Sequence, residues 1–296
     1  MRRYLPLIAT LLVIAVNAAA NIVPINGFNT GELSALNPTG FTPAGWVFGI
    51  WSLIYLGLIV FGVASIVGSD RTRARADGLV NVYLLNALAN AAWIFAWHYR
   101  QVELSFALML VILATLIVIF IKLRRHPAPT AREFLAIDGP FSLYFGWITT
   151  ATLANLGAVF FVQQYYPFSL SMDQWALITV CAATAIYVWM GAVTRDIVYC
   201  AVFVWAAIGI AYRPTGITEP VKLAAWAGIA ALALCIVWAA FSARRDPWRF
   251  SSEPLEHLER SSFSRLHRRV CSPAKCILAC GVIMACDQGT TLPGTY

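Results

Sequence analysis

Eight apolar stretches of about 17 to 26 residues follow one another along this chain of 296 residues. At a rise of about 1.5 Å per residue, a helix of that length matches the roughly 30 Å hydrocarbon core of a bilayer. The composition agrees, because only 12% of the residues are charged, against about 25% in soluble domains. The sequence therefore predicts an all-α membrane protein with about eight transmembrane helices. The expected spans are residues 5–23, 44–67, 78–98, 104–123, 137–162, 173–193, 196–212 and 221–242, of which the seventh is the shortest.

Basic residues divide unevenly between the two sets of connections that alternate along such a bundle. One set carries only Arg100, Arg213 and Lys222. Because lysine- and arginine-rich connections stay in the cytoplasm, the other set, with twelve basic residues, is predicted to be cytoplasmic together with both termini. An odd number of spans would place basic clusters on both sides, so the charge pattern supports eight. The twelve are Arg2, Arg3, Arg71, Arg73, Arg75, Lys122, Arg124, Arg125, Arg132, Arg195, Arg244 and Arg245.

The first stretch allows a second interpretation. Arg2 and Arg3, the apolar run after them and the small residues 18–20 also resemble a cleavable signal peptide. The apolar run to Val23 is long for the core of such a peptide, so we expect an uncleaved first helix. Either interpretation leaves the topology of the remaining spans unchanged.

The last part of the chain differs in character from the spans. Residues 243–296 form a basic, cysteine-containing segment that is predicted to be a cytoplasmic tail. Its cysteines match no paired zinc or iron–sulfur spacing and have no histidine between them, so no metal site is expected. The net charge of +7 comes from connections and tail rather than from an amphipathic recognition element, so nucleic acid is not an expected partner. The tail cysteines are Cys271, Cys276, Cys280 and Cys286.

Two amides and two indoles share one face of the third span. At about 100° per residue, their spacing places them within a stripe roughly 60° wide. An amide without a partner costs several kcal/mol in hydrocarbon, so this face is expected to point into the bundle. There it either lines a ligand site or supplies interhelical hydrogen bonds. The four residues are Asn86, Asn90, Trp93 and Trp97.

The fifth span repeats this arrangement. Tyr144, Trp147 and Asn155 lie on a similarly narrow arc, and the amide again needs a partner. The span is expected to start at Asp138 and Pro140, because proline is tolerated in a first turn and aspartate favours the positive end of a helix.

Aromatic residues also gather where the second span begins. Prolines and a glycine precede Trp46, Trp51 and Tyr55. Trp46 also suits the interfacial aromatic belt of membrane proteins, whereas Trp51 and Tyr55 lie deeper in the span. We include all three in a candidate ligand site with the aromatic and amide side chains of the third and fifth spans.

Catalytic and ion-transport signatures are absent from the sequence. It has no nucleophile elbow, phosphate-binding glycine loop, H-E-x-x-H motif or pair of intramembrane carboxylates. No span carries a lysine, arginine or glutamate near its centre, where proton relays and charge-moving carriers normally have one. The interior instead offers indoles, phenols and amides, which suit a flat apolar ligand. Neither catalysis nor a required cofactor is therefore expected.

A recognisable set of residues in the second, third and fifth spans comprises Pro38, Pro43, Trp46, Val47, Phe48, Gly49, Trp51, Tyr55, Asn90, Trp93, Pro140, Phe141, Leu153 and Asn155. Together they resemble the TspO/MBR family, the tryptophan-rich sensory proteins related to the mitochondrial translocator protein. The resemblance covers residues 1–162. The tryptophans of the second span are one residue closer than is usual in that family, and the aromatic position of the fifth span is shifted to Tyr144 or Trp147.

The resemblance implies a five-helix core, residues 1–162, that binds a tetrapyrrole, sterol or synthetic aromatic ligand between its helices. Residues 163–242 would be a three-helix transmembrane extension, as in longer bacterial relatives. The resemblance also implies that the protein is located in the bacterial inner membrane. It further implies a sensory or regulatory protein with a bound porphyrin or haem-type ligand. A transporter of such a molecule and a porphyrin-degrading enzyme are the alternatives.

The expected partners are the lipid bilayer and this hydrophobic ligand, and a homodimer is left open. The candidate ligand-binding residues are Trp46, Trp51, Tyr55, Asn86, Asn90, Trp93, Trp97, Tyr144, Trp147 and Asn155.

Overall fold

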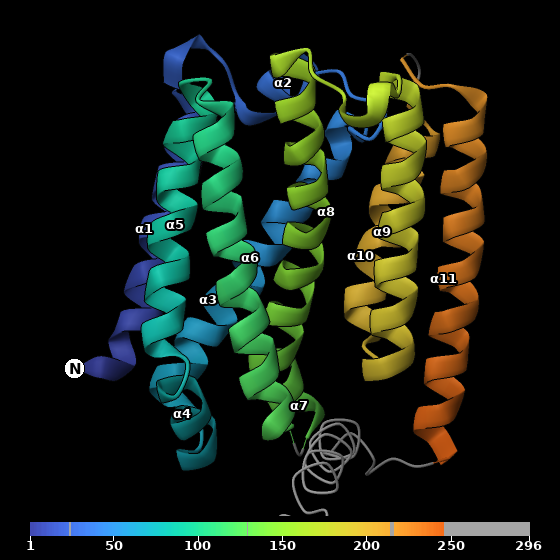
Figure 1. Cartoon of the computed structure of the whole chain (residues 1–296). Coiled ribbons are helices and arrows are strands. Elements are labelled where there is room, and N and C mark those ends of the chain that lie inside the picture. Colours follow the sequence, from blue (N-terminus) through green and yellow to red (C-terminus); the bar gives the residue numbers. More distant parts are fainter. Residues whose placement is uncertain (24, 129, 214–215, 246–296) are drawn as a thin grey trace, which may run out of the picture. The chain divides into compact units, whose positions relative to one another are not determined.

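The computed structural model describes residues 1–245 except 24, 129, 214 and 215 (Figure 1), and every regular element in this part is helical. The long helices are α1 (Leu5–Ile22), α3 (Ile50–Val67), α5 (Val80–His98), α6 (Val102–Arg125), α8 (Gly139–Gln163), α9 (Met172–Thr194), α10 (Ile197–Ala211) and α11 (Glu219–Arg245). Shorter elements are α2 (Thr30–Ala35), α4 (Asp70–Asp77), α7 (Ala131–Glu133), the π turn η4 (Phe134–Asp138) and the 3-10 turns η1 (Arg2–Tyr4), η2 (Ile25–Gly27), η3 (Gly45–Gly49) and η5 (Pro167–Ser169). The predicted tail, residues 243–296 with its four cysteines, lies almost entirely outside the described residues.

Seven helices of the described part are long and apolar enough to cross a membrane. The remaining predicted span, α10, is apolar but has only 15 residues, or about 22 Å of helix. It packs against α8, α9 and α11 and buries most of its side chains among them. A helix enclosed by protein does not have to match the thickness of the lipid around it. The structure thus confirms an all-α membrane protein.

The long helices alternate in direction, so the connections gather at two ends of the bundle (Figure 1). The end with Met1, α4 and α7 is called the proximal end here, and the end with α2 and η5 the distal end. Contacts between connections support this grouping: Lys122 Nζ donates to the carbonyl of Gly78 at 3.0 Å, and Arg2 pairs with Asp77 at 3.0 Å. The basic connections therefore share the proximal end, and their cytoplasmic location stays a prediction.

The fifth span begins earlier than its sequence suggests. The helix continues back from α8 through η4 and α7 to Thr130, whose hydroxyl accepts a hydrogen bond from the amide of Glu133 at 3.2 Å. The α-helix α8 does begin at Gly139, with Asp138 at its N-cap and Pro140 in its first turn as expected, but the helical segment as a whole starts at Ala131. Pro140 has no N–H to bond the carbonyl four residues earlier, and the wider π turn just before it accommodates this loss within a continuous helix.

An aromatic cluster fills the proximal half of the bundle. Phe61 of α3 meets Phe141 of α8 at 4.8 Å and Tyr83 of α5 at 5.3 Å between ring centroids, each edge to face. All three side chains are buried, and Thr10 of α1 shares a 2.6 Å hydrogen bond with the Tyr83 hydroxyl. This packing leaves no large space among α1, α3, α5 and α8 at that level, so any sizeable cavity between them has to lie nearer the distal end.

Candidate functional site

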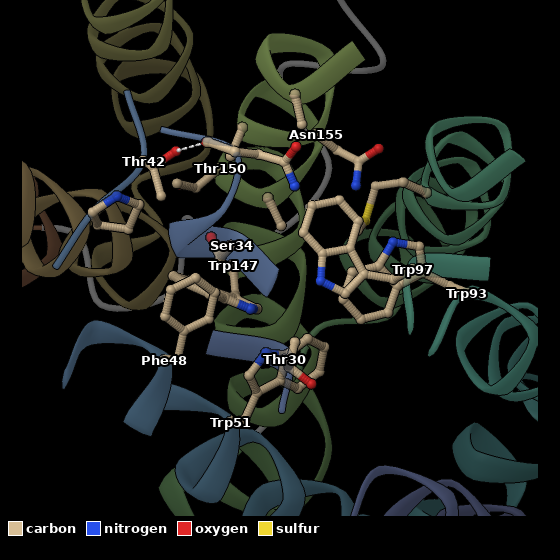
Figure 2. A pocket seen from close by; sticks show the side chains of 16 residues that line it. Thr30, Ser34, Thr42, Phe48, Trp51, Trp93, Trp97, Trp147, Thr150 and Asn155 are labelled. Carbon is tan, nitrogen blue, oxygen red and sulfur yellow. Dashed lines mark hydrogen bonds between the residues drawn. The ribbon is translucent and has the colours of Figure 1, made fainter. Parts of the chain in front are cut away.

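A cavity lies in the distal half of the bundle, with walls from α2, α3, α5, α6 and α8 (Figure 2). The empty space between its walls, counted together with the open space at its mouth, is about 590 Å³. Apolar and aromatic side chains predominate, with a few hydroxyl and amide groups among them. The lining residues are Thr30, Ser34, Asn37, Thr42, Pro43, Phe48, Trp51, Trp93, Trp97, Met109, Trp147, Thr150, Ala151, Ala154, Asn155 and Ala158.

Four indoles make up most of the aromatic wall. The rings of Trp93 and Trp97, one helical turn apart on α5, lie within 13° of parallel with centroids 6.1 Å apart. Trp51 meets Trp147 edge to face at 6.4 Å, and Phe48 packs on the same Trp147 ring at 5.8 Å. Flat ring faces and edges of this kind pack well against a flat apolar body.

Three of these indoles carry N–H groups without a hydrogen-bond partner among the described residues. They are the Nε1 atoms of Trp93, Trp97 and Trp147, whose residues are 6%, 7% and 2% exposed. A buried donor without an acceptor costs about 1–3 kcal/mol. Three such donors around one apolar cavity favour an occupant that brings acceptor atoms.

The lining of the cavity is uncharged. None of its residues is acidic, basic or a histidine, so an ionised group placed in its interior would lose its hydration without gaining a counter-charge. Within the described part of the chain, no group of histidine, cysteine, aspartate and glutamate side chains is arranged to hold a metal ion. The cavity is suited to the uncharged portion of a ligand.

Half of the ten predicted site residues stand in the wall of this cavity. They come from three helices that lie far apart in the sequence. Their side chains meet because α6 packs against both α5 and α8, while α8 also packs against α3. One of them also joins helices, since the Asn155 carbonyl accepts a hydrogen bond from Ser105 of α6 at 3.1 Å. The predicted residues in the wall are Trp51, Trp93, Trp97, Trp147 and Asn155.

The polar members of the other half connect helices outside the wall. Asn86 donates to the Thr115 hydroxyl at 2.8 Å and so links α5 to α6. Asn90 donates to the Tyr144 hydroxyl at 2.9 Å and accepts from Asn17 at 3.1 Å, linking α5 to α8 and α1. These are the interhelical hydrogen bonds that the sequence left open as the alternative role for these amides.

The two remaining predicted residues, Tyr55 and Trp46, flank the site. Tyr55 stacks on Trp51 with centroids 5.4 Å apart and thereby supports that wall from behind. Trp46 is 49% exposed and meets Trp205 of α10 edge to face at 4.7 Å. The interfacial position that was considered for Trp46 stays a prediction.

The segment between α1 and α3 supplies cavity residues that the sequence pattern did not single out. Thr30 and Ser34 lie on α2, which begins with a capping box between Asn29 and Glu32. The Asn-x-x-Glu spacing was a signal for this helix, but nothing local shows that it covers a cavity. The lining residues that were not among the ten predicted site residues are, over all elements, Thr30, Ser34, Asn37, Thr42, Pro43, Phe48, Met109, Thr150, Ala151, Ala154 and Ala158.

Helix α10 packs tightly against the start of the second span. A Cβ on Gly209 would lie 2.0 Å from Val47 Cγ2, so only glycine permits this approach. The Gly209 carbonyl accepts a hydrogen bond from the amide of Ala44 at 3.0 Å, and Trp205 Nε1 donates to the Val47 carbonyl at 3.0 Å. The predicted three-helix extension therefore contacts the predicted core directly next to the cavity.

A partly buried cation continues this contact beyond the end of α10. The Arg213 guanidinium donates to the carbonyls of Thr39 and Thr42 at 2.7 and 3.1 Å. Removal from water lowers the pKa of this guanidinium, yet an arginine stays charged at neutral pH. Because Thr42 and Pro43 line the cavity, the extension holds part of the cavity wall in place.

Comparison with known proteins decides the family. A family model described as TSPO-like protein matches residues 3–238. The chain belongs to the TSPO-like protein family. The match confirms the relationship to TspO/MBR proteins that the residues of the second, third and fifth spans indicated, and it takes in the last three helices as well. No curated protein and no solved structure matches the chain. The division of this TSPO-like protein into core and extension at residue 162 stays a prediction.

Proposed function

We propose that this TSPO-like protein is a sensory or regulatory membrane protein whose distal cavity binds a flat apolar ligand of the tetrapyrrole type. The observation that carries the proposal is the set of three buried indole N–H groups without partners in a cavity walled by aromatic rings. The ring faces would stack on the ligand, and the donors would bond acceptor atoms at its edge.

The position of the cavity favours sensing. A ligand in it would touch Thr42 and Pro43, which belong to the segment that α10 anchors through Gly209 and Arg213. A ligand in the cavity would therefore be connected to the last three helices by residues that contact one another. A regulatory effect would require that this segment adopt a different arrangement when the cavity is occupied.

Porphyrin binding to the purified protein tests the proposal. Addition of a porphyrin should shift its visible absorption band saturably as the ring leaves water for the cavity. Replacing both Trp93 and Trp147 with phenylalanine keeps aromatic walls but removes two donors, and should weaken the affinity at least about tenfold, or about 1.4 kcal/mol. Unchanged affinity in a folded double variant would exclude this cavity as the site.

A matched control uses indoles far from the cavity. Trp189 of α9 and Trp226 of α11 are 62% and 42% exposed and do not line it. Their double replacement with phenylalanine should leave the porphyrin affinity unchanged.

Uptake into proteoliposomes distinguishes the two functions considered from the sequence. A sensor binds porphyrin without accumulating it inside the vesicles, whereas a transporter does both.

A further inference from the structure

Among the described residues at the distal end of the bundle, one arginine has a side chain without a hydrogen bond or ion pair. Of the basic residues described there, Arg213 bonds two backbone carbonyls, and Lys222 pairs with Glu219 at 2.8 Å. The side chain of the exposed Arg100, between α5 and α6, has no hydrogen bond or ion pair with any described residue. The nearest acid along the chain, Glu103, is engaged by the side chain of Gln163.

Arg100 faces a second hollow that adjoins the aromatic cavity. This hollow is lined by Leu33, Asn37, Trp97, Arg100, Val102 and Val162. Two of these residues, Asn37 and Trp97, also line the aromatic cavity, so the two spaces share a wall. The aromatic cavity has no charged residue in its lining, whereas the lining of the adjoining hollow includes Arg100.

The backbone fixes Arg100 relative to the shared indole. The amide of Arg100 bonds the carbonyl of Trp97 at 3.0 Å, and the amide of Gln101 bonds the carbonyl of Ala96 at 2.9 Å. This pair of hydrogen bonds is the Schellman ending of a helix, with Arg100 in the left-handed region at φ +58°. Glycine is the usual residue there because a side chain makes that conformation strained. The two hydrogen bonds thus fix the backbone of Arg100, which lies three residues after Trp97, in a conformation that costs some backbone energy.

We propose that Arg100 binds a carboxylate at the edge of the ligand whose flat apolar body lies in the aromatic cavity. The ligand class is then a flat ring system that bears an acidic side chain, such as a tetrapyrrole with propionate groups. A carboxylate cannot reside in the uncharged cavity, whereas a free guanidinium offers it two parallel hydrogen bonds. This inference rests on the function proposed above and assigns the ligand's acidic edge to the Arg100 side of the shared wall.

Two porphyrins that differ only in charge test the proposal. Protoporphyrin with free carboxylates and its dimethyl ester are titrated against the full-length protein and Arg100→Gln. The variant should bind the free acid at least about tenfold more weakly and the ester with unchanged affinity. The affinity of the intact protein for the acid should fall as ionic strength rises, because exposed charges are screened, and this dependence should disappear in the variant.

Two further variants separate charge from structure. Lys222→Gln removes another cation from the same end, and should bind both porphyrins like the original protein. Arg100→Lys keeps the charge but loses the planar fork, and should fall between the original protein and Arg100→Gln for the acid. Circular dichroism and size-exclusion chromatography verify that each variant is folded.

The outcomes distinguish this inference from the proposed function. Both porphyrins could bind while Arg100→Gln leaves both affinities unchanged or lowers both equally. That result would exclude Arg100 as the carboxylate site and would leave the proposal of a ligand in the aromatic cavity intact. If neither porphyrin binds the original protein, the proposed function fails and the inference fails with it. Loss of acid binding in Lys222→Gln to the same extent would show general attraction by the distal end rather than a site at Arg100.

Discussion

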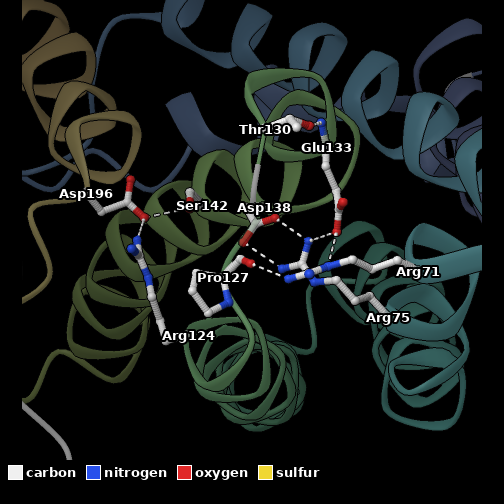
Figure 3. A network of polar contacts seen from close by, with 9 residues as sticks. All are labelled: Arg71, Arg75, Arg124, Pro127, Thr130, Glu133, Asp138, Ser142 and Asp196. Carbon is white, nitrogen blue, oxygen red and sulfur yellow. Dashed lines mark hydrogen bonds and ion pairs between the residues drawn. The ribbon is translucent and has the colours of Figure 1, made fainter. Parts of the chain in front are cut away.

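Arg75 of α4 and Asp138 at the end of η4 form a two-pronged ion pair, with Nη1–Oδ2 and Nη2–Oδ1 distances of 3.0 and 2.9 Å (Figure 3). Arg75 also donates to Glu133 at 2.8 Å, and its side chain is only 8% exposed. Burial lowers the pKa of Arg75, but hydrogen bonds and charges from both carboxylates outweigh this and leave the pKa above its usual value. One buried cation thus ties the α3–α5 connection to the start of the fifth span.

Replacing Arg75 with methionine should destabilise the bundle by about 3–5 kcal/mol, because it leaves Asp138 without its ion-pair partner and Glu133 with only the longer contact to Arg71 at 3.9 Å. The midpoint of detergent-induced unfolding in bicelles measures this loss. Arg73 provides the control, since its pair with Asp70 is largely exposed, and Arg73→Met should shift the midpoint little. Equal shifts in the two variants would mean that the Arg75 contacts contribute no more than a surface pair.

The Asn90–Tyr144 hydrogen bond should contribute to stability rather than to ligand binding. A double-mutant cycle with Asn90→Ala and Tyr144→Phe should give a coupling energy of about 0.6 kcal/mol, the average for polar pairs in a membrane bundle, and at most about 1.7 kcal/mol. Porphyrin affinity should change little, because neither side chain lines the cavity. A large loss of affinity in the folded single variants would instead place these residues in the ligand site.

Gly209→Ala should move η3 away from α10, because the new Cβ would overlap Val47. We expect a loss of about 1–3 kcal/mol together with weaker porphyrin binding, since the displaced segment carries Thr42 and Pro43. Gly49→Ala is the matched control, as it has open space around it and should be neutral or stabilising by up to about 1 kcal/mol. Adding Val47→Ala to Gly209→Ala should restore both properties in part, and failure to do so would disprove the clash as the cause.

Arg100→Gly should raise stability while it removes acid binding. Glycine relieves the left-handed backbone conformation, and the gain is at most about 1 kcal/mol after its own entropy cost. The thermal unfolding midpoint and the affinity for the free-acid porphyrin measure the two effects in the same preparation. A lower midpoint in this variant would show that the Arg100 side chain is needed for the structure, which would undermine its assignment as a ligand-binding group.

The sequence by itself determined the spans, because their length and their apolar composition are local properties of the chain. The expected limits of the first, second and sixth spans agree with α1, η3–α3 and α9 to within two residues. The charge pattern likewise grouped the basic connections correctly at one end of the bundle. The start of α8 at Asp138 and Pro140 was predicted for an equally local reason, but the helical turns before it were not, since proline marks a first turn more often than it follows a π turn.

Only the tertiary structure decided which side chains share a cavity. Helical spacing placed Asn90 and Trp93 on one face, yet Asn90 bonds Tyr144 while Trp93 lines the cavity, and only the neighbouring helices determine that difference. The segment before α3, which forms part of the cavity wall, is held by contacts between residues far apart in the sequence. One is the hydrogen bond from Trp205 to Val47, two residues that are 158 positions apart. Periodicity records which face of a helix is buried, but it holds no information about the partner that buries it.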